Sequence, residues 1–443
     1  MDRIKRVKYI IIAMMLAAAV MPSFIWADAK VPEVEGTSVI MIDRASGQIL
    51  YEKNAVEKRD PASITKILTC LVVLENLELD RVVTVPEDSS PIGVNIDMHK
   101  GEKLTVEQLL YAMMLPSAND AARVLAIETA GDIDSFCDMM NERAKECGAK
   151  NTHFTNTNGL NTAGQEHHRT TAEDLALIAG EALDNKTFRK LVTTVRYTIP
   201  PTNKSEARKL KTTNPLLKSG KKAEVDGVKI PLEYERATGI KTGTTSTAGN
   251  CFAASAKDGD TEFIVITLDS GEYTRFTDAV QLFEYGFENF GTQILAREKK
   301  EIQSLKVRRG ASSHVPAGAA DTLAVTCSRN SDGSIEEADM EVKLIPAEDK
   351  VEAPVCKGDV VGTVQLVDSS GKVHKSCDAI ALENVDRGGP LSAIGIPDDM
   401  VPLFAAAVVT AALIVLITLI LIRQRKAARE TETKRSETAP KDV

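Results

Sequence analysis

The sequence has few of the residues that mark several common classes of protein. Aromatic side chains make up 4% of its 443 residues, and there is one Trp. Its 54 basic residues are outnumbered by 63 acidic ones, and the formal net charge of −9 argues against a nucleic-acid partner. The six histidines form no H-E-x-x-H motif, and a loop or hydrogen-bonding role explains His167-His168 better than a metal site does. We therefore expect neither a metal nor a cofactor.

The cysteines also lack the spacing of a metal or disulfide framework. All seven occur singly, without a Cys-x-x-Cys pair, so neither a zinc cluster nor a dense set of disulfides is expected. Because seven is an odd number, at least one thiol has no partner within the chain. We expect mostly buried free thiols, and one bridge among Cys327, Cys356 and Cys377 is an open alternative.

Two uncharged segments near the ends indicate an exported, membrane-attached protein. Residues 9–26 are apolar, follow four basic residues and lead to Ala27-Asp28-Ala29, which predicts a signal peptide over 1–29, with an uncleaved anchor as the alternative. Residues 401–422 carry no charge and can cross a hydrocarbon core of about 30 Å, although a buried core helix has the same pattern. The basic residues that follow place the tail, 423–443, in the cytoplasm and the rest of the chain outside.

The order of the predicted elements indicates an α/β (α+β) first domain. Strand-like runs at 38–42 and 48–51 flank a Gly-containing turn and predict a hairpin. Apolar residues at helical spacing predict the next elements, and further strand-like runs follow. The predicted helices are 63–79, 106–115, 119–129, 133–147, 171–183 and 277–290, and the later strands are 225–230, 251–255 and 262–268. We expect the early hairpin to join the later strands in one antiparallel sheet, with a helical subdomain at about 99–220 inserted between them.

The pattern changes after residue 290. Short alternating runs separated by Gly, Ser and Asp predict a small all-β domain over 291–387. Its predicted strands include 302–307, 322–327, 340–344 and 360–367. Residues 388–400 are a predicted linker to the transmembrane helix at 401–422, and the charged tail is expected to be disordered.

The first motif that can carry chemistry is Ser63-Ile-Thr-Lys66, at a predicted helix start. A spacing of three residues puts the hydroxyl and the ammonium group on one face of a helix. Serine needs an adjacent base to act as a nucleophile, and lysine can be that base when burial and cationic neighbours lower its pKa from about 10.4. Taken alone, the motif is better explained as a helix-capping serine beside a solvated lysine.

Two further motifs follow in order along the chain. Ser117-Ala-Asn119 lies between two predicted helices, where a hydroxyl and an amide can relay a proton and hold a substrate amide; a plain helix cap is the alternative. Lys241-Thr-Gly243 leads into a predicted strand, where lysine and threonine can hold a carboxylate and glycine lets a substrate backbone approach. An exposed turn at the end of the strand is the alternative there.

In this order, and in an exported chain, the three motifs resemble those of the penicillin-recognising serine acyl-transferases. The segments around them are similar to the low-molecular-mass penicillin-binding proteins, which are serine-type D-alanyl-D-alanine carboxypeptidases. These segments are 61–66, 115–122, 154–160, 170–175 and 239–245. The resemblance covers about 34–290 and continues more weakly through 356–363 and 382–385. It implies a penicillin-recognising serine transferase fold for 34–290, followed by that family's C-terminal module.

The resemblance also implies a role for the residues of the first two motifs. Ser63 forms the acyl-enzyme, Lys66 takes its proton, and Ser117 and Asn119 relay protons and bind the substrate. The backbone amides of Ser63 and Thr244 form the oxyanion hole. The implied substrate is a peptidoglycan stem peptide that ends in D-Ala-D-Ala, and β-lactams are the implied covalent inhibitors.

The third motif is implied to bind the end of the substrate. Lys241 and Thr242 bind the terminal carboxylate or help to protonate the leaving group, and Gly243 allows close approach. Arg275, which lies outside the three motifs, is a further candidate for a carboxylate contact. The implied location is the outer face of a bacterial cell membrane, where such an enzyme trims the peptides that are available for cross-linking.

Two other functions share these motifs. A β-lactamase needs a base that activates water for rapid deacylation, and Glu173 is acidic, but its surroundings indicate the start of a helix. The additional β domain and the membrane span are also unusual for a secreted β-lactamase. A catalytically silent scaffold that binds cell wall is the second alternative; the intact Ser63, Lys66, Ser117 and Lys241 argue against it, and substrate turnover would decide.

Overall fold

The structure is a computed structural model that describes residues 31–437, with gaps at 90–91, 161–166, 218–219, 221, 226–227 and 349. The predicted signal peptide lies outside the described residues. The chain divides into two compact units. The first contains the described residues up to Gln293 together with Val325–Glu337, and the second contains Ile294–Ala324 and the residues from Ala338 onward.

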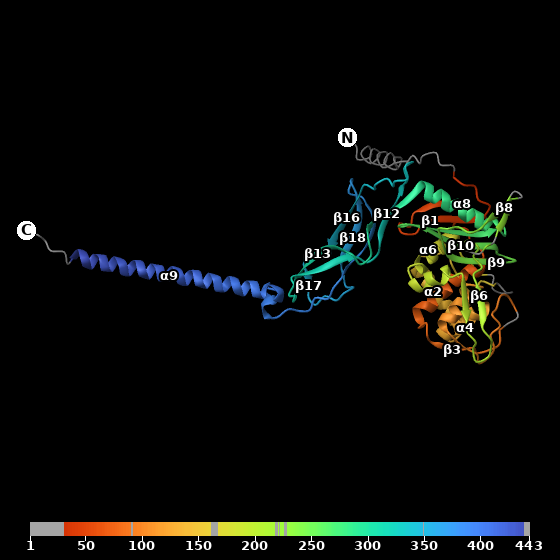
Figure 1. The fold of residues 1–443 in the computed structure, drawn as a ribbon, viewed down its shortest axis with the longest axis horizontal. Coiled ribbons are helices and arrows are strands. Elements are labelled where there is room, and N and C mark those ends of the chain that lie inside the picture. The colour runs from red at the N-terminus through yellow and green to blue at the C-terminus, as the bar shows by residue number, and fades with distance from the viewer. Residues whose placement is uncertain are drawn as a thin grey trace, which may run out of the picture. The chain divides into compact units, whose positions relative to one another are not determined.

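A five-stranded sheet forms the centre of the first unit (Figure 1). Its order is β2 (Ile49–Lys53), β1 (Ser38–Asp43), β11 (Thr261–Ser270), β10 (Gly249–Asp258) and β9 (Ala237–Thr245). Every neighbouring pair is antiparallel. The prediction that the early hairpin joins the later strands is therefore confirmed, and β9, which carries the Lys-Thr-Gly motif, is an edge strand of this sheet.

The chain between β2 and β9 forms helices and three small hairpins. The helical elements are η1 (Ala62–Thr65), α2 (Lys66–Asn76), α3 (Val106–Met114), α4 (Asn119–Ala130), α5 (Ile133–Glu146), α6 (Ala172–Ala182) and α7 (Lys186–Thr193). The hairpins are β3 (Val82–Thr84) with β4 (Lys103–Thr105), β5 (Arg196–Ile199) with β6 (Arg208–Lys211), and β7 (Lys222–Val225) with β8 (Val228–Pro231). The single predicted strand at 225–230 is wrong, because its residues are divided between β7 and β8, which pair with each other and not with the main sheet.

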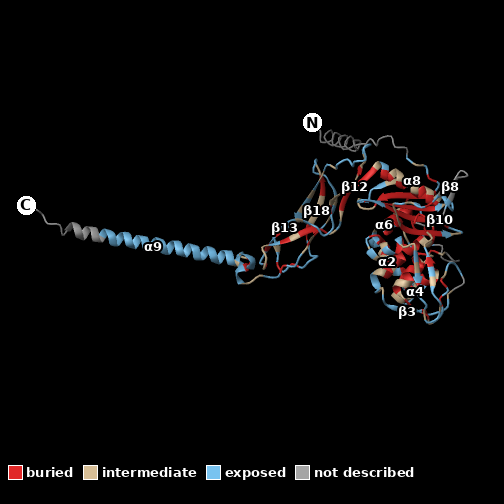
Figure 2. Ribbon diagram, viewed as in Figure 1, coloured by how far each residue is buried: buried red, intermediate tan, exposed pale blue. Residues whose placement is uncertain are grey.

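Both faces of the main sheet are buried (Figure 2). Along β1, Val39 and Met41 pack with α8 (Thr274–Asn289) in one hydrophobic cluster, and Ile40 and Ile42 pack with the helices on the opposite face. Successive side chains of a strand point to opposite faces. A strand that is covered on both faces therefore consists of consecutive apolar residues and shows no alternation.

The second unit is built mainly of β-strands. Its six-stranded sheet has the order β16 (Met340–Pro346), β18 (Val360–Asp368), β19 (Val373–Ala381), β14 (His314–Ala319), β13 (Glu301–Arg308) and β17 (Val351–Glu352). A separate two-stranded sheet pairs β12 (Phe290–Ala296) with β15 (Leu323–Ser328), and the boundary between the two units passes through both of these strands. The prediction of an all-β domain after the first domain is confirmed by these strands.

The predicted linker contains two short helical turns, η2 (Pro390–Ile394) and η3 (Asp398–Met400). The backbone N–H of Ser313 donates to the Asp399 carboxylate over 3.0 Å, which ties this segment to the turn between β13 and β14. The last helix, α9 (Val401–Glu437), is long and apolar enough to cross a membrane.

The predicted disorder of the tail is wrong for residues 423–437, because α9 continues without a break to Glu437. This part of the chain is rich in Ala, Arg, Lys and Glu, which are strong helix formers. Extending an existing helix also avoids the free-energy cost of nucleating a new one.

Several cysteines of the first unit are buried free thiols, as the sequence predicted for most of the cysteines. They include Cys70, Cys137 and Cys251. Cys356 and Cys377 are free as well, so none of the bridges that were left open among the last three cysteines is formed.

Candidate active site

Ser63 and Lys66 lie at the start of the first buried helix. The predicted helix from residue 63 is wrong in detail, because Ser63 belongs to the 3₁₀ turn η1 and the α-helix begins at Lys66. Residues three apart eclipse each other in a 3₁₀ turn. The Lys66 Nζ accordingly lies 3.0 Å from the Ser63 Oγ, which is hydrogen-bond distance for a base and its nucleophile.

The Lys66 side chain is fully buried and surrounded by oxygen atoms. Besides Ser63, its Nζ contacts the Ser117 Oγ at 3.3 Å, the Asn119 Oδ1 at 2.7 Å and the backbone carbonyl of Asn158 at 3.3 Å. All of these atoms can accept a hydrogen bond, and none belongs to a carboxylate. The amine therefore has hydrogen-bond partners but no ion pair among the described residues.

Ser117 and Asn119 are not helix caps. The N-cap of α4 is Ala118, and this end of the helix has no side-chain cap. Ser117 has a left-handed backbone with φ of 74°, which is uncommon for a residue other than glycine. Both side chains instead reach Lys66, so the simple capping role that was open from the sequence is wrong.

Burial and nearby charge both act on the two lysines. Burial lowers the pKa of Lys66 well below its ordinary value, the charge of Lys241 lowers it further, and Asp120 opposes the shift. Burial, followed by the charge of Arg275, lowers the pKa of Lys241 to about 7. The site therefore favours a neutral Lys66, which is the protonation state that a general base requires.

Strand β9 approaches the nucleophile because it carries a glycine. A Cβ atom on Gly243 would lie 2.9 Å from the Ser63 backbone nitrogen and 3.0 Å from the Ala62 Cβ. Such contacts are too short for any other residue without a shift of the backbone. The third position of the Lys-Thr-Gly motif thus sets how closely the sheet edge packs against η1.

The remaining motif residues form a hydrogen-bonded group on β9. The Lys241 Nζ donates to the Thr242 carbonyl over 2.9 Å, and the Thr242 hydroxyl lies 2.6 Å from that of Thr213. An Nη1 nitrogen of Arg275 donates to the Thr244 hydroxyl over 2.8 Å.

Arg275 approaches the motif from α8. The sequence placed it before the last helix, but α8 begins at Thr274, so Arg275 lies in the first turn of that helix. It also donates to the Gly243 carbonyl over 2.9 Å. These bonds attach the guanidinium group to the edge strand, whereas its contact with a substrate carboxylate stays a prediction.

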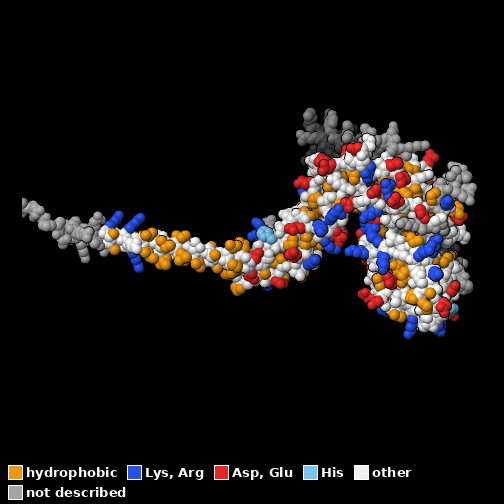
Figure 3. All heavy atoms as spheres, in the orientation of Figure 1, with side chains coloured by type: hydrophobic (Ala, Val, Ile, Leu, Met, Phe, Trp, Pro, Cys, Tyr) orange, Lys and Arg blue, Asp and Glu red, His pale blue; other side chains and the backbone are white. Residues whose placement is uncertain are grey.

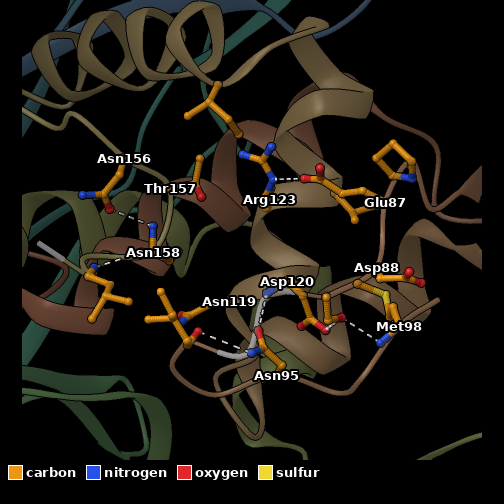
Figure 4. Close-up of a pocket in the computed structure, with 16 residues that line it drawn as sticks. Glu87, Asp88, Asn95, Met98, Asn119, Asp120, Arg123, Asn156, Thr157 and Asn158 are labelled. Atoms are coloured by element: carbon orange, nitrogen blue, oxygen red, sulfur yellow. Dashed lines mark hydrogen bonds and ion pairs between the residues drawn. The ribbon is translucent and has the colours of Figure 1, made fainter. Parts of the chain in front are cut away.

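A cavity of about 480 Å³ adjoins this site (Figure 4). Its lining includes Asn119 and Asn158, which also contact Lys66, and the ion pair of Arg123 with Glu87. Ser63 does not line it. The cavity thus lies next to the Ser63–Lys66 pair, and Asn119 and Asn158 belong to both the cavity lining and the surroundings of Lys66.

Two contributors to the site had no assigned role in the sequence analysis. The Asn158 carbonyl accepts a hydrogen bond from Lys66, and Thr213 contacts Thr242. Asn158 lies in the segment 154–160, which the family resemblance includes, and its Asn-Gly pair indicates a turn. Thr213 has no comparable sequence signal.

Other residues that the sequence raised lie apart from this group. Within the described chain, no hydrogen bond joins Glu173 to Ser63, Lys66 or Ser117. Glu173 lies in the first turn of α6, and its backbone N–H donates to the Ala55 carbonyl. His167 is exposed, whereas His168 is fully buried. The described residues contain no cluster of His, Cys, Asp or Glu side chains suited to a metal ion.

Comparison with known families explains this combination of elements. Residues 26–272 match the D-alanyl-D-alanine carboxypeptidase family, and residues 290–387 match the C-terminal domain of penicillin-binding protein 5. The chain belongs to the D-alanyl-D-alanine carboxypeptidase family. It is 31% identical to the D-alanyl-D-alanine carboxypeptidase DacC of Escherichia coli, with 81% of this chain and 86% of that protein aligned. It is 29% identical to DacF of Bacillus subtilis, over 80% of this chain and 87% of that protein.

Solved structures of the family show the same fold. Penicillin binding protein 5 from Haemophilus influenzae matches with a TM-score of 0.58 and 25% identity, over 81% of this chain and 99% of that chain. A mutant of a Streptomyces DD-transpeptidase matches with a TM-score of 0.51 and 32% identity, over 58% of this chain and 99% of that chain. The fold is therefore that of a penicillin-recognising serine transferase, followed by an all-β domain and an apolar C-terminal helix.

The close contact of Gly243 with η1 leads to a first prediction. Gly243→Ala should slow acylation of the protein by penicillin at least tenfold, because the new Cβ must push Ser63 and β9 apart. Gly180→Ala is the matched control, since Gly180 lies in α6 and its nearest contact would be ordinary, with Ile264 at 3.8 Å. Acylation rates that are equal in both variants and the wild type would contradict this account of the edge strand.

Proposed function

We propose that this chain is a serine-type D-alanyl-D-alanine carboxypeptidase that removes the terminal D-alanine from peptidoglycan stem peptides. The observation that carries the proposal is the fully buried Lys66 amine, which lies 3.0 Å from the Ser63 hydroxyl and has no carboxylate partner in the described part of the chain. Membership of the family supports the same function. The catalytic domain spans 34–290, with a helical subdomain at about 99–220, and the all-β domain spans 291–387.

The first half of the proposed reaction forms an acyl-enzyme. The Ser63 oxygen attacks the carbonyl carbon of the penultimate D-alanine while Lys66 takes the hydroxyl proton. The backbone N–H groups of Ser63 and Thr244 stabilise the negative charge that develops on the carbonyl oxygen. The C–N bond then breaks, and the terminal D-alanine leaves with a proton relayed from Lys66 through Ser117, whose hydroxyl lies 3.3 Å from the amine.

The second half releases the shortened peptide. Water attacks the ester carbonyl, Lys66 takes a proton from it, and Ser63 leaves with its proton restored. The Asn119 side chain, next to Lys66 and the adjoining cavity, holds the peptide. Lys241 and Thr242 bind the terminal carboxylate at the start of the cycle, so a free C-terminus is required. β-Lactams, which acylate the same serine, act as covalent inhibitors.

The central test is release of free D-alanine from a pentapeptide ending in D-Ala-D-Ala. The wild type should release it, and Ser63→Ala and Lys66→Met should lose at least a thousandfold in kcat, because each lacks one member of the nucleophile–base pair. Mass spectrometry should find one penicillin adduct, on the peptide that contains Ser63. An adduct that persists in Ser63→Ala would contradict the assignment, and binding of penicillin without any turnover would favour the silent scaffold.

The lowered pKa of Lys241 predicts a loss of activity at alkaline pH. Lys241 is protonated below about pH 7 and loses its charge above it, so kcat/KM for the free-acid peptide should fall as pH rises through that value. The lost charge-assisted contact is worth about 1.5–3 kcal/mol, or roughly one to two orders of magnitude. Lys241→Arg should remove the fall, since arginine keeps its charge.

A peptide with an amidated C-terminus is the matched control for this measurement. It lacks the carboxylate, so its kcat/KM should be low and should show no fall near pH 7. An alkaline fall of the same size in Lys241→Arg would show that another group titrates.

The membrane topology belongs to the same proposal. Removal of residues 1–29 and insertion of 401–422 would leave the catalytic domain outside the cell and the tail, 423–443, in the cytoplasm. The support is the helix α9, whose apolar side chains are followed by Lys and Arg side chains (Figure 3). A peptidase held in this way acts on peptidoglycan next to the membrane.

Proteolysis of intact cells tests this topology. Protease should digest the catalytic domain but spare an epitope placed after residue 437, and the epitope should become sensitive only after the membrane is permeabilised. Truncation after Met400 should release a soluble enzyme with unchanged kcat, because the hydrogen bond of Asp399 to Ser313 keeps the segment before the span on the β domain. A tail that is digested in intact cells would contradict the orientation.

A further inference from the structure

The residue before the nucleophile has an unusual backbone conformation. Ala62 has φ of 48°, in the left-handed region that residues other than glycine rarely adopt. Its carbonyl and the N–H of Ser63 belong to one planar peptide group. Any contact that holds the Ala62 carbonyl therefore also sets the direction of the Ser63 N–H, the proposed oxyanion-hole donor.

Thr65 holds that carbonyl. The Thr65 side chain is fully buried, and its hydroxyl donates to the Ala62 carbonyl over 2.8 Å. The same hydroxyl oxygen lies 2.9 Å from the Nε2 of His168, which is also fully buried. The Thr65 oxygen thus has one partner on each side, and neither Ala62 nor His168 is among the residues that line the adjoining cavity.

The hydrogen bonds of His168 have a defined direction. Its Nδ1 accepts a hydrogen bond from the Thr155 backbone N–H over 3.0 Å, so the ring proton is on Nε2. Nε2 must then donate to Thr65, which leaves the Thr65 hydrogen for the Ala62 carbonyl. The result is a continuous relay from Thr155 through the imidazole and the hydroxyl to the peptide before Ser63.

The surroundings keep the imidazole neutral and in place. Burial, together with the neighbouring His153 and Arg169, lowers the pKa of His168 to about 3. The ring stacks on Phe154 with its centroid 4.9 Å away. Backbone hydrogen bonds between His153 and Arg169, of 2.8 and 2.9 Å, fix the segment that carries His168. The donor therefore stays available throughout the neutral pH range.

The segment 154–160 supports the same peptide from a second direction. A Cβ atom on Gly159 would lie 1.7 Å from the Ala62 carbonyl oxygen, and Gly159 has φ of 77°, so only glycine fits. The preceding residue, Asn158, accepts a hydrogen bond from Lys66. One short segment thus contacts both the peptide that precedes the nucleophile and the base.

We infer that Thr65 and His168 are positioning residues, which aim and polarise the Ser63 N–H as an oxyanion-hole donor without touching the substrate. A hydrogen bond accepted by a peptide carbonyl makes the N–H of the same peptide a stronger donor. The inference rests on the proposed function, since the N–H has this task only if Ser63 is acylated. It also gives Thr65, which lies between Ser63 and Lys66, a role that the motif alone does not reveal.

The decisive comparison is between Thr65→Val and Thr65→Ser. Valine has nearly the shape of threonine but lacks the hydroxyl, and serine keeps the hydroxyl. Removing a whole oxyanion-hole donor typically costs about 100- to 1,000-fold in rate, so a donor that is present but poorly aimed should cost less. We expect Thr65→Val to slow penicillin acylation of the full-length protein at least tenfold, and Thr65→Ser to stay within about threefold of the wild type.

The ester carbonyl of the acyl-enzyme gives a readout that loss of packing alone would not move. In difference infrared spectra with a carbonyl-labelled penicillin, Thr65→Val should shift the ester stretch to higher frequency, because its hydrogen bond is weaker. His168→Leu should shift it in the same direction, and the double variant should lose little more than either single one, since both changes break one relay. Thr65→Ser should leave the frequency unchanged.

The possible outcomes separate this inference from the proposed function. If the wild type forms no adduct at Ser63, the proposed function fails and the inference fails with it. If the wild type is acylated and Thr65→Val matches it in both rate and ester frequency, only the inference is overturned. If Thr65→Val is slow but its ester frequency is that of the wild type, the hydroxyl supports packing alone and the inference is also overturned.

Discussion

The burial of one lysine amine without an ion pair among the described residues is the constraint on which the rest of this structure depends. Lys66 is fully buried, and its hydrogen-bond partners among the residues that the structure describes are neutral oxygen atoms. An unfolded chain would protonate it at neutral pH, so its lowered pKa makes the folded state less favourable there, and stability rises as pH increases between the folded and unfolded pKa values. The lower stability at neutral pH accompanies a functional advantage, since a neutral amine beside a serine hydroxyl is the base that the reaction needs.

Two chain segments must meet at this amine, and glycines decide how closely they do. The edge strand β9 reaches η1 because Gly243 has no Cβ to meet Ser63. The segment 154–160 reaches the same turn from elsewhere because Gly159 leaves room for the Ala62 carbonyl. The sheet is buried on both faces and its edge is therefore fixed, so the position of Lys241 relative to Lys66 is set by packing.

Electrostatics and topology reinforce each other in this arrangement. Burial lowers the pKa of both lysines; the charge of Lys241, on the sheet edge, further favours the neutral form of Lys66. The charge of Arg275, on α8, further lowers the pKa of Lys241. The same cations suit a substrate that ends in a carboxylate. When such a substrate binds, its charge would favour protonated Lys241, so substrate binding and proton position are coupled through this residue.

The sequence by itself determined the family, the joining of the early hairpin to the later strands, and the three motifs, because these depend on local patterns and on residue types in a fixed order. It also indicated the all-β domain and the apolar helix. It could not show that η1 is a 3₁₀ turn, that Ser117 and Asn119 contact Lys66 and do not cap α4, or that His168 is linked to the peptide before Ser63. These features arise where segments about 50 to 100 residues apart pack together. Only the tertiary structure decides such contacts, since the geometry of a buried hydrogen bond depends on both of its partners.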